Sequence, residues 1–221
     1  MQTNSTTAGL FELLGLGDEL DPAANELLDA AVEQFCITGV RRTTTDEIAR
    51  AAGVNRATLY RHLGPRKKII SAAYRRESHR ALGRLVAALN TPEPSTAREK
   101  IRAIIIAAMS ELHGNALLHR LQRADADETR KALTTDAAEV VELGTLTLRL
   151  LIDDIRASHL APDEEPDFDA ATVAAMLTRM TQSIVVSPGG PLSLATEEEQ
   201  IAFADEIATP LIMNATAPKR P

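Results

Sequence analysis

Apolar residues recur along most of this chain at spacings of three and four, the period of a helix that buries one face. Proline, glycine and capping residues divide the pattern into separate segments. They predict helices at about 21–39, 44–52, 55–63, 65–89, 95–113, 117–121, 127–160, 168–186 and 196–213. We therefore expect an all-α protein of about nine helices.

The segment 43–68 predicts two short helices joined by a tight turn. Thr44 and Glu47 form a capping box, in which the hydroxyl accepts a first-turn N–H and the carboxylate reaches back to the cap. Gly53 supplies the left-handed residue that ends the first helix, and Asn55 caps the second. Two helices joined through a turn that contains glycine form a helix-turn-helix motif.

The second helix of this motif exposes small and polar residues. At about 100° per residue, Leu59 and Leu63 face the interior of the domain, whereas Ala57 and Arg61 point away from it. Because Ala57 and Thr58 are small, the helix backbone can approach base pairs in a major groove. Alternatively, this could be an ordinary solvated helix face. The charge of the surrounding segment distinguishes the two interpretations.

Positive charge is concentrated around the motif. The segment 40–76 contains ten Lys and Arg residues and two acidic residues, a formal charge of +8. The whole chain carries −7, so the remaining residues carry −15. A basic segment in an acidic chain indicates a local binding surface for a polyanion, and here it favours DNA.

The run at 43–69, with AAGV before the turn and TLYRHLGPRKKI after it, resembles the DNA-binding domain of TetR-family transcriptional regulators. The match is close from Leu27 to about Tyr74. The residues at the family's spacing are Gly53, Thr58, Leu59, Tyr60, His62 and the basic pair Arg66 and Lys67. Leu63 stands where an aromatic residue is more usual, and Pro65 with Arg66 replaces a commoner Ser-Lys. The rest of the chain matches only in its helical layout.

This resemblance implies a homodimeric repressor that binds a palindromic operator in double-stranded DNA and is released by an effector. It divides the chain into an N-terminal arm at 1–20, a three-helix DNA-binding domain at 21–74 and a larger helical domain for ligand binding and dimerisation at 75–221. We expect base contacts from Arg56, Ala57, Thr58 and Arg61. We also expect Asn55, the cap of this helix, to be among the DNA-binding residues. We expect phosphate contacts from Thr44, Thr45, Tyr60, His62 and Lys67.

The second domain carries two further sets of candidate residues. Apolar repeats on the last two helices indicate a subunit interface made by Val173, Leu177, Ile184, Ile201, Phe203, Ala204, Ala208 and Leu211. Polar or polarizable residues in apolar helices favour a mostly apolar cavity lined by Met109, His113, Met176, Thr178, Met180 and Gln182. Each of these six alone is typical of a core or a surface. The resemblance is what implies a small, largely apolar effector between the middle helices.

Composition restricts the other classes of protein. Of the 221 residues, 44% are hydrophobic, 25% are charged and only 3% are aromatic, which predicts an aliphatic core in a globular protein. No apolar run approaches the roughly 18 residues of a membrane span, and no signal peptide is evident. The single cysteine, Cys36, excludes an internal disulfide and favours a reducing cytoplasm. It is more typical of a small buried hydrophobe than of a redox sensor.

Motifs for catalysis or for cofactor binding are missing from the sequence. It contains no GxGxxG, P-loop, GxSxG or HExxH. His113 and His119 are six residues apart, a spacing that does not place both on one helix face, so we expect neither a metal site nor a cofactor. The alternatives to a regulator are a DNA-associated architectural or interaction protein without an effector and, last, an enzyme.

Overall fold

The structure is a computed structural model that describes residues 21–88, 96–122, 138–187 and 192–216. Its helices are α2 (Pro22–Thr38), α3 (Thr45–Ala51), α4 (Arg56–Leu63), α5 (Arg66–Ala88), α6 (Ala97–Gly114), α7 (Ala116–Gln122), α9 (Ala138–His159), α10 (Ala170–Val186), α11 (Glu197–Phe203), the π-helical turn η1 (Ala204–Ala208) and α12 (Thr209–Met213). Two short strands, β1 (Glu165–Pro166) and β2 (Ala215–Thr216), pair antiparallel. The expected all-α class is confirmed, and the short strand pair is an addition that the helical pattern did not predict.

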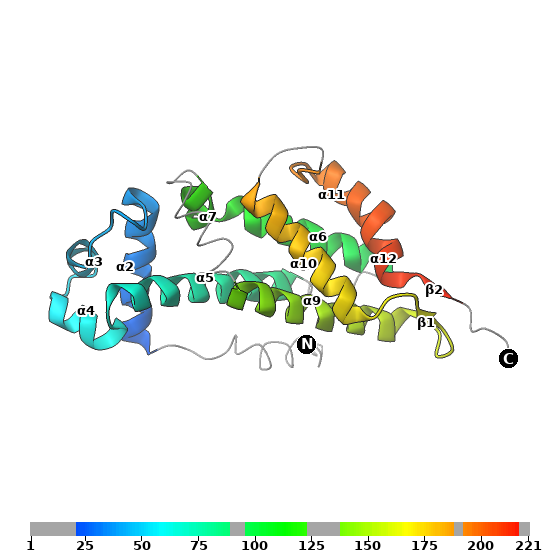
Figure 1. The fold of residues 1–221 in the computed structure, drawn as a ribbon, viewed down its shortest axis with the longest axis horizontal. Coiled ribbons are helices and arrows are strands. Elements are labelled where there is room, and N and C mark those ends of the chain that lie inside the picture. Colours follow the sequence, from blue (N-terminus) through cyan, green and yellow to red (C-terminus); the bar gives the residue numbers. More distant parts are fainter. Residues whose placement is uncertain (1–20, 89–95, 123–137, 188–191, 217–221) are drawn as a thin grey trace.

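The molecule is elongated, with α2, α3 and α4 gathered at one end (Figure 1). From that end, α5 extends toward the packed helices α6, α9, α10, α11 and α12. We call residues 21–74 the head, and residues 96–114 with 138–216 the body. The head contains the helix-turn-helix motif, so α5 is the continuous connection between this motif and the body.

The core of the head forms around α2, which buries Leu28 and Phe35. Ile48 of α3, Leu59 of α4 and Ile69 of α5 pack against them, and all five side chains are fully buried. Burying a side chain of this kind contributes roughly 1.5–3 kcal/mol. The apolar face that the sequence predicts for 21–39 is therefore the surface on which the two helices of the motif are assembled.

Packing crosses the domain boundary that we expected at residue 74. Leu117 of α7 is buried in the core of the head, and α7 lies against α2. On α5, Ile69 and Ala73 belong to the core of the head, whereas Val86 belongs to the core of the body. Both α5 and α7 therefore link the two parts, although α7 follows the boundary in sequence.

The body is built on the packing of α9 against α10, with α6 and the terminal helices packed around them. Its core is largely aliphatic, as composition predicts. The core side chains include Ile101, Ile104, Met109, Leu151, Ile152, Ile155, Val173, Leu177, Phe203 and Ile212. Arg102 of α6 also binds Asp205 of η1 through two hydrogen bonds, of which the Nε–Oδ1 bond is 2.7 Å long.

Two helices begin at residues other than those expected. Thr96 caps α6, because it stands three residues before Glu99 and the pair forms a capping box; Ser95, at the expected start, lies outside the described residues. The helix expected from about Phe168 begins at Ala170, after Asp169 accepts a hydrogen bond from the Thr172 N–H at 2.9 Å.

The terminal helix expected at 196–213 is interrupted by a π-helical turn. Its start is as expected, because Thr196 and Glu199 form a capping box. Further along, the Thr209 N–H donates to the Ala204 carbonyl oxygen, five residues back. Pro210 follows directly, and proline has no N–H for the regular α-helical bond and crowds the carbonyl four residues earlier. The interruption therefore has a local cause.

The remaining differences concern the ends of the described segments. Pro22 occupies the first turn of α2 as expected, but the Asp21 side chain makes no capping hydrogen bond. The arm expected at 1–20, and the part of the 127–160 helix before residue 138, lie outside the described residues. Within the residues that are described, no helix combines the length and the apolar character that crossing a bilayer requires.

Candidate DNA-binding site

The helix-turn-helix motif has the local geometry that its sequence predicts. Glu47 donates its backbone N–H to Thr44 Oγ1 at 3.2 Å, and its carboxylate accepts the Thr44 N–H at 2.7 Å. Gly53 has a φ of +67°, in the left-handed region that favours glycine. Asn55 Oδ1 accepts the Thr58 N–H at 2.8 Å. These contacts fix the start of both helices and the turn between them.

The buried face of α4 determines what its other face presents. Leu59 is fully buried in the core of the head, so the opposite side of the helix points outward. There Arg56, Ala57 and Arg61 are exposed, and Thr58 is half-buried on the flank. This is the small, polar surface that base contacts in a major groove require.

Arg56 is folded over α4. Its Nη2 donates to Tyr60 Oη at 3.2 Å, and its guanidinium carbon lies 5.2 Å from the centre of the Tyr60 ring. Its Nη1 is also 3.6 Å from a carboxylate oxygen of Asp46. The sequence carries no local signal for this pairing, because Asp46 lies on α3 and Arg56 on α4. Arg56 must leave these contacts before it can reach a base.

Tyr60 joins the two helices of the motif. Its phenol hydrogen-bonds with Thr45 of α3 as well as with Arg56, and these bonds hold the pKa of Tyr60 below its ordinary value. Thr45 is only 7% exposed. Such burial is evidence against the phosphate contact that we expected from the Thr45 side chain, and its role here is to position Tyr60. Tyr60 itself is half-buried at the edge of the surface.

The other expected phosphate contacts have different environments. Lys67 is exposed at the start of α5. His62 is exposed, with Nδ1 3.6 Å from Asp21 and Nε2 3.4 Å from Arg61 Nη2. The Thr44 hydroxyl is 2.8 Å from the Glu47 carboxylate, so its polar atoms are already engaged. Among these residues, Lys67 therefore has the geometry that suits a phosphate contact best.

Arg66 has a role that its sequence position did not reveal. Its guanidinium donates to the backbone carbonyl oxygens of Val40, Arg41 and Thr43, in the loop between α2 and α3. Thr43 is itself buried, and its hydroxyl donates to the Gly39 carbonyl oxygen at 2.8 Å. Arg66 therefore holds this loop in place. A contact across 23 to 26 residues has no local sequence signal.

These internal contacts reduce the cationic surface that DNA could meet. Of the ten basic residues in 40–76, Arg66 is half-buried and Arg76 is buried, where it binds Asp29 and Glu77. The eight exposed ones are Arg41, Arg42, Arg50, Arg56, Arg61, Lys67, Lys68 and Arg75. The surface around the motif is still strongly basic, as DNA binding requires.

The structure buries most of the expected interface residues inside the chain itself. The core of the body contains Val173, Leu177, Phe203, Ala204 and Ala208, and Ile184 and Leu211 pack against it. Ile201 is half-buried. The five buried side chains are not available to contact a second copy, whereas Ile184, Ile201 and Leu211 are half-buried and remain candidates. On α10, the exposed residues are Ala171, Thr172, Ala175, Met176, Arg179 and Ser183, and Met176 is 53% exposed.

The six residues expected around an effector do not share one environment. Met109 is buried in the core of the body, and Met180 packs against that core. Thr178 is half-buried and faces Gly144 of α9. By contrast, His113 and Met176 are exposed, and Gln182 accepts a hydrogen bond from Arg179 at 2.9 Å. Among the described residues, no cluster of His, Cys, Asp and Glu could hold a metal ion.

A capped helix-turn-helix whose second helix exposes a small polar face among cations defines a DNA-binding regulator. Residues 27–73 match the family model for bacterial regulatory proteins of the tetR family. The head therefore matches the DNA-binding domain of the TetR family of bacterial transcriptional regulators. The matched residues cover the head from the middle of α2 to the first part of α5.

Similarity to known proteins extends beyond the head. The chain is 28% identical over 201 residues to an uncharacterized HTH-type transcriptional regulator of Mycobacterium tuberculosis, covering 90% of this chain and 89% of that one. It is 26% identical over 175 residues to the HTH-type transcriptional repressor KstR2 of Mycolicibacterium smegmatis, with coverages of 76% and 82%. The fold is similar to that of the TetR family repressor AlkX from a Dietzia strain, with a TM-score of 0.63 at 19% identity and coverages of 86% and 98%.

Proposed function

We propose that this protein is a repressor that binds a palindromic operator as a homodimer and is released by a small effector. The observation that carries the proposal is the exposed face of α4, with Ala57 and Arg61 outward and the basic side chains around them. In this proposal, α4 enters the major groove, and Ala57, Thr58 and Arg61 meet base edges. Arg56 joins them once it leaves Asp46.

Symmetry supplies the reason for a dimer. Two copies of α4 reach successive major grooves of a palindrome when they lie about 34 Å apart, which requires an isologous contact between bodies. We assign that contact to the outer face of α10, where Ala171 and Ala175 permit close approach and Met176 is apolar and exposed. This assignment keeps the first of the two expected helices, but it uses the exposed face of that helix in place of the buried one.

Release by an effector requires a body whose arrangement changes how the head is held. Because α5 belongs to both cores, a ligand that moves α5 relative to the body also moves α4. A coupling free energy of about 1–3 kcal/mol would lower DNA affinity roughly 5–150-fold. DNA would lower the affinity of the effector by the same factor.

Selection from random duplex DNA tests the proposal. We expect an enriched motif with two-fold symmetry and half-sites about one helical turn apart. Light scattering of the purified complex should then show two chains on each palindrome. An enriched motif without symmetry, or a single chain on the selected site, would refute the homodimer. Failure to enrich any sequence would refute operator recognition itself.

A further inference from the structure

A cleft of about 410 Å³ lies where the head meets the body. It is formed by α2, α5, α6 and α7, and its lining residues are Val32, Cys36, Glu77, Arg84, Ser110, Glu111, Gly114, Asn115, Ala116 and Leu117. None of the six residues expected around an effector lines it. Its volume is in the range of small-molecule sites, which often form between domains.

The end of α6 leaves room in this cleft. Gly114 is the last residue of α6, and a Cβ atom added there would meet nothing within 4 Å. The next residue, Asn115, turns the chain into α7 by accepting the Leu118 N–H on Oδ1 at 2.9 Å. Leu117 then packs into the core of the head. The Asn115 cap and the packing of Leu117 therefore fix the start of α7 beside the cleft.

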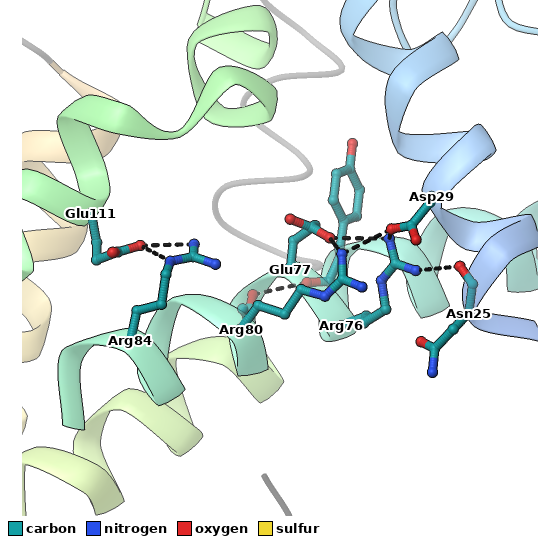
Figure 2. A network of polar contacts seen from close by, with 9 residues as sticks. Asn25, Asp29, Arg76, Glu77, Arg80, Arg84 and Glu111 are labelled. Atoms are coloured by element: carbon teal, nitrogen blue, oxygen red, sulfur yellow. Dashed lines mark hydrogen bonds and ion pairs between the residues drawn. The ribbon is translucent and has the colours of Figure 1, made fainter. Parts of the chain in front are cut away.

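The inner wall of the cleft carries two carboxylates, Glu77 and Glu111, and each of them is paired with arginine. The side chains of Glu77 and Glu111 are 20% and 25% exposed, whereas Arg84 is 53% exposed. Figure 2 shows Arg84 reaching across from α5 to Glu111 on α6, where its Nε lies 2.8 Å from the carboxylate. Next to these groups, Cys36 is half-buried. Burial raises the pKa of the Cys36 thiol, and the charge of Glu77 raises it further, while Arg120 opposes them.

Apolar side chains complete the lining. Val32 of α2 is half-buried and Leu117 of α7 is buried, and both pack in the core of the head. A ligand in the cleft would therefore meet hydrocarbon on the side of the head, and on α5 and α6 the carboxylates of Glu77 and Glu111 with the Arg84 guanidinium that pairs with Glu111. We propose that the cleft is a binding site for a small organic cation with an apolar body, whose charged group lies beside Glu77 and Glu111.

Such a ligand would compete with the arginines that hold the head. Glu77 accepts hydrogen bonds from Arg76 at 3.1 Å and from Arg80 at 3.2 Å. Both arginines also bind Asp29 of α2, each at 2.9 Å, so α5 and α2 are joined through this network (Figure 2). If the proposed repressor function holds, a cation that draws Glu77 away from Arg76 and Arg80, and Glu111 away from Arg84, changes the position of the head and the affinity for DNA.

Cys36 provides the direct test, because it is the single cysteine of the chain. Its rate of modification is measured with 2-aminoethyl methanethiosulfonate, a cation, and 2-sulfonatoethyl methanethiosulfonate, an anion. Each rate is divided by the rate for the same chain unfolded in urea. We expect the normalised cation-to-anion ratio to be at least tenfold. Glu111→Gln should reduce this ratio, whereas Glu26→Gln, an exposed position on α2 outside the cleft, should leave it unchanged.

Protection of the thiol tests occupancy. We expect 2-phenylethylammonium to slow the modification of Cys36 at concentrations at which neutral 2-phenylethanol and anionic 3-phenylpropanoate do not. Gly114→Phe should fill the cleft and abolish the response to the cation, while a thermal melt confirms that the variant is folded. Equal normalised rates for the two reagents, or protection that persists in Gly114→Phe, would overturn the proposed site.

The link to DNA is measured separately. Affinity for the selected operator is determined for the wild-type protein with and without 2-phenylethylammonium, and for Gly114→Phe. Protection of Cys36 together with a lower operator affinity supports both the site and its coupling to the head. Protection with unchanged operator affinity overturns the coupling. If the wild-type protein does not bind the operator even without the cation, the proposed function is wrong. The modification rates of Cys36 then still test whether the cleft binds the cation.

Discussion

The Arg66 guanidinium, at the start of α5, donates a hydrogen bond to the carbonyl oxygen of Arg41, 3.1 Å away in the loop between α2 and α3. The same side chain also binds the carbonyl oxygens of Val40 and Thr43. The planar guanidinium carries five donors in a fixed arrangement, whereas a lysine offers one compact ammonium. Arg66 therefore holds the loop that carries the exposed cations Arg41 and Arg42.

This relationship predicts that Arg66→Lys lowers operator affinity although the formal charge is kept. The loop would lose carbonyl contacts, while the number of cations at the surface stays the same. The slope of log affinity against log salt should therefore remain close to that of the wild type. Lys67→Gln is the control, and it should make the slope shallower by about 0.9 if Lys67 neutralises one phosphate. An unchanged affinity in Arg66→Lys would rule out the positioning role.

Arg61 should be a residue that reads sequence. It is exposed on α4 opposite the buried Leu59. Among the described contacts, its side chain approaches only His62, with Arg61 Nη2 3.4 Å from His62 Nε2. If it forms a bidentate contact with guanine, Arg61→Ala should cost about 1–3 kcal/mol and relax the preference at one base pair. Repeating the selection with this variant checks the prediction. An unchanged motif at full affinity would refute it.

The capping signals made much of this fold predictable from the sequence. Thr44 with Glu47, Asn55, and Thr196 with Glu199 act over three residues, so the sequence alone reveals them. The exposed face of α4 was predictable for a related reason, because the helical period places it opposite Leu59.

Contacts between distant segments were not predictable in this way. Arg66 reaches a loop more than twenty residues earlier, and Arg56 pairs with an acid on another helix. The apolar repeat along α10 predicts a subunit interface, but Val173 and Leu177 lie in the core of the body. Periodicity shows that a face is buried without showing what buries it, so the same pattern fits either location.

The bond between Arg102 and Asp205 predicts a pH-dependent contribution to stability. Hydrogen bonding to Arg102 holds the pKa of Asp205 below its ordinary value of 3.8. A carboxyl whose pKa is lower in the folded state stabilises that state above its unfolded pKa and loses this effect as pH falls through the folded pKa. The melting temperature of the wild type should exceed that of Asp205→Asn at pH 5 and above, and the difference should shrink below about pH 3.8.

The comparison needs a second carboxylate, because other acids also become protonated in this range. Asp153→Asn serves as the control, since Asp153 is exposed on α9 and lies 3.7 Å from Arg149. Exposed pairs of this kind contribute roughly 0–1 kcal/mol. The melting temperature of Asp153→Asn should differ less from that of the wild type than the melting temperature of Asp205→Asn does at pH 5 and above. If the difference in melting temperature between the wild type and Asp205→Asn is constant from pH 6 to pH 3, the ionised Asp205 does not stabilise the fold through its bond to Arg102.

The exposed face of α10 gives the last prediction. Met176 is 53% exposed and Val173, on the same helix, is fully buried, so the two positions separate dimerisation from folding. Met176→Glu should lower the mass in solution from two chains toward one and weaken operator binding, with little change in helical content. Val173→Ala should instead cost on the order of 2 kcal/mol of folding stability through lost packing, and leave the mass of the folded protein unchanged. Sedimentation and thermal melts distinguish these effects. A dimer that survives Met176→Glu at low protein concentration would place the interface on another face of the body.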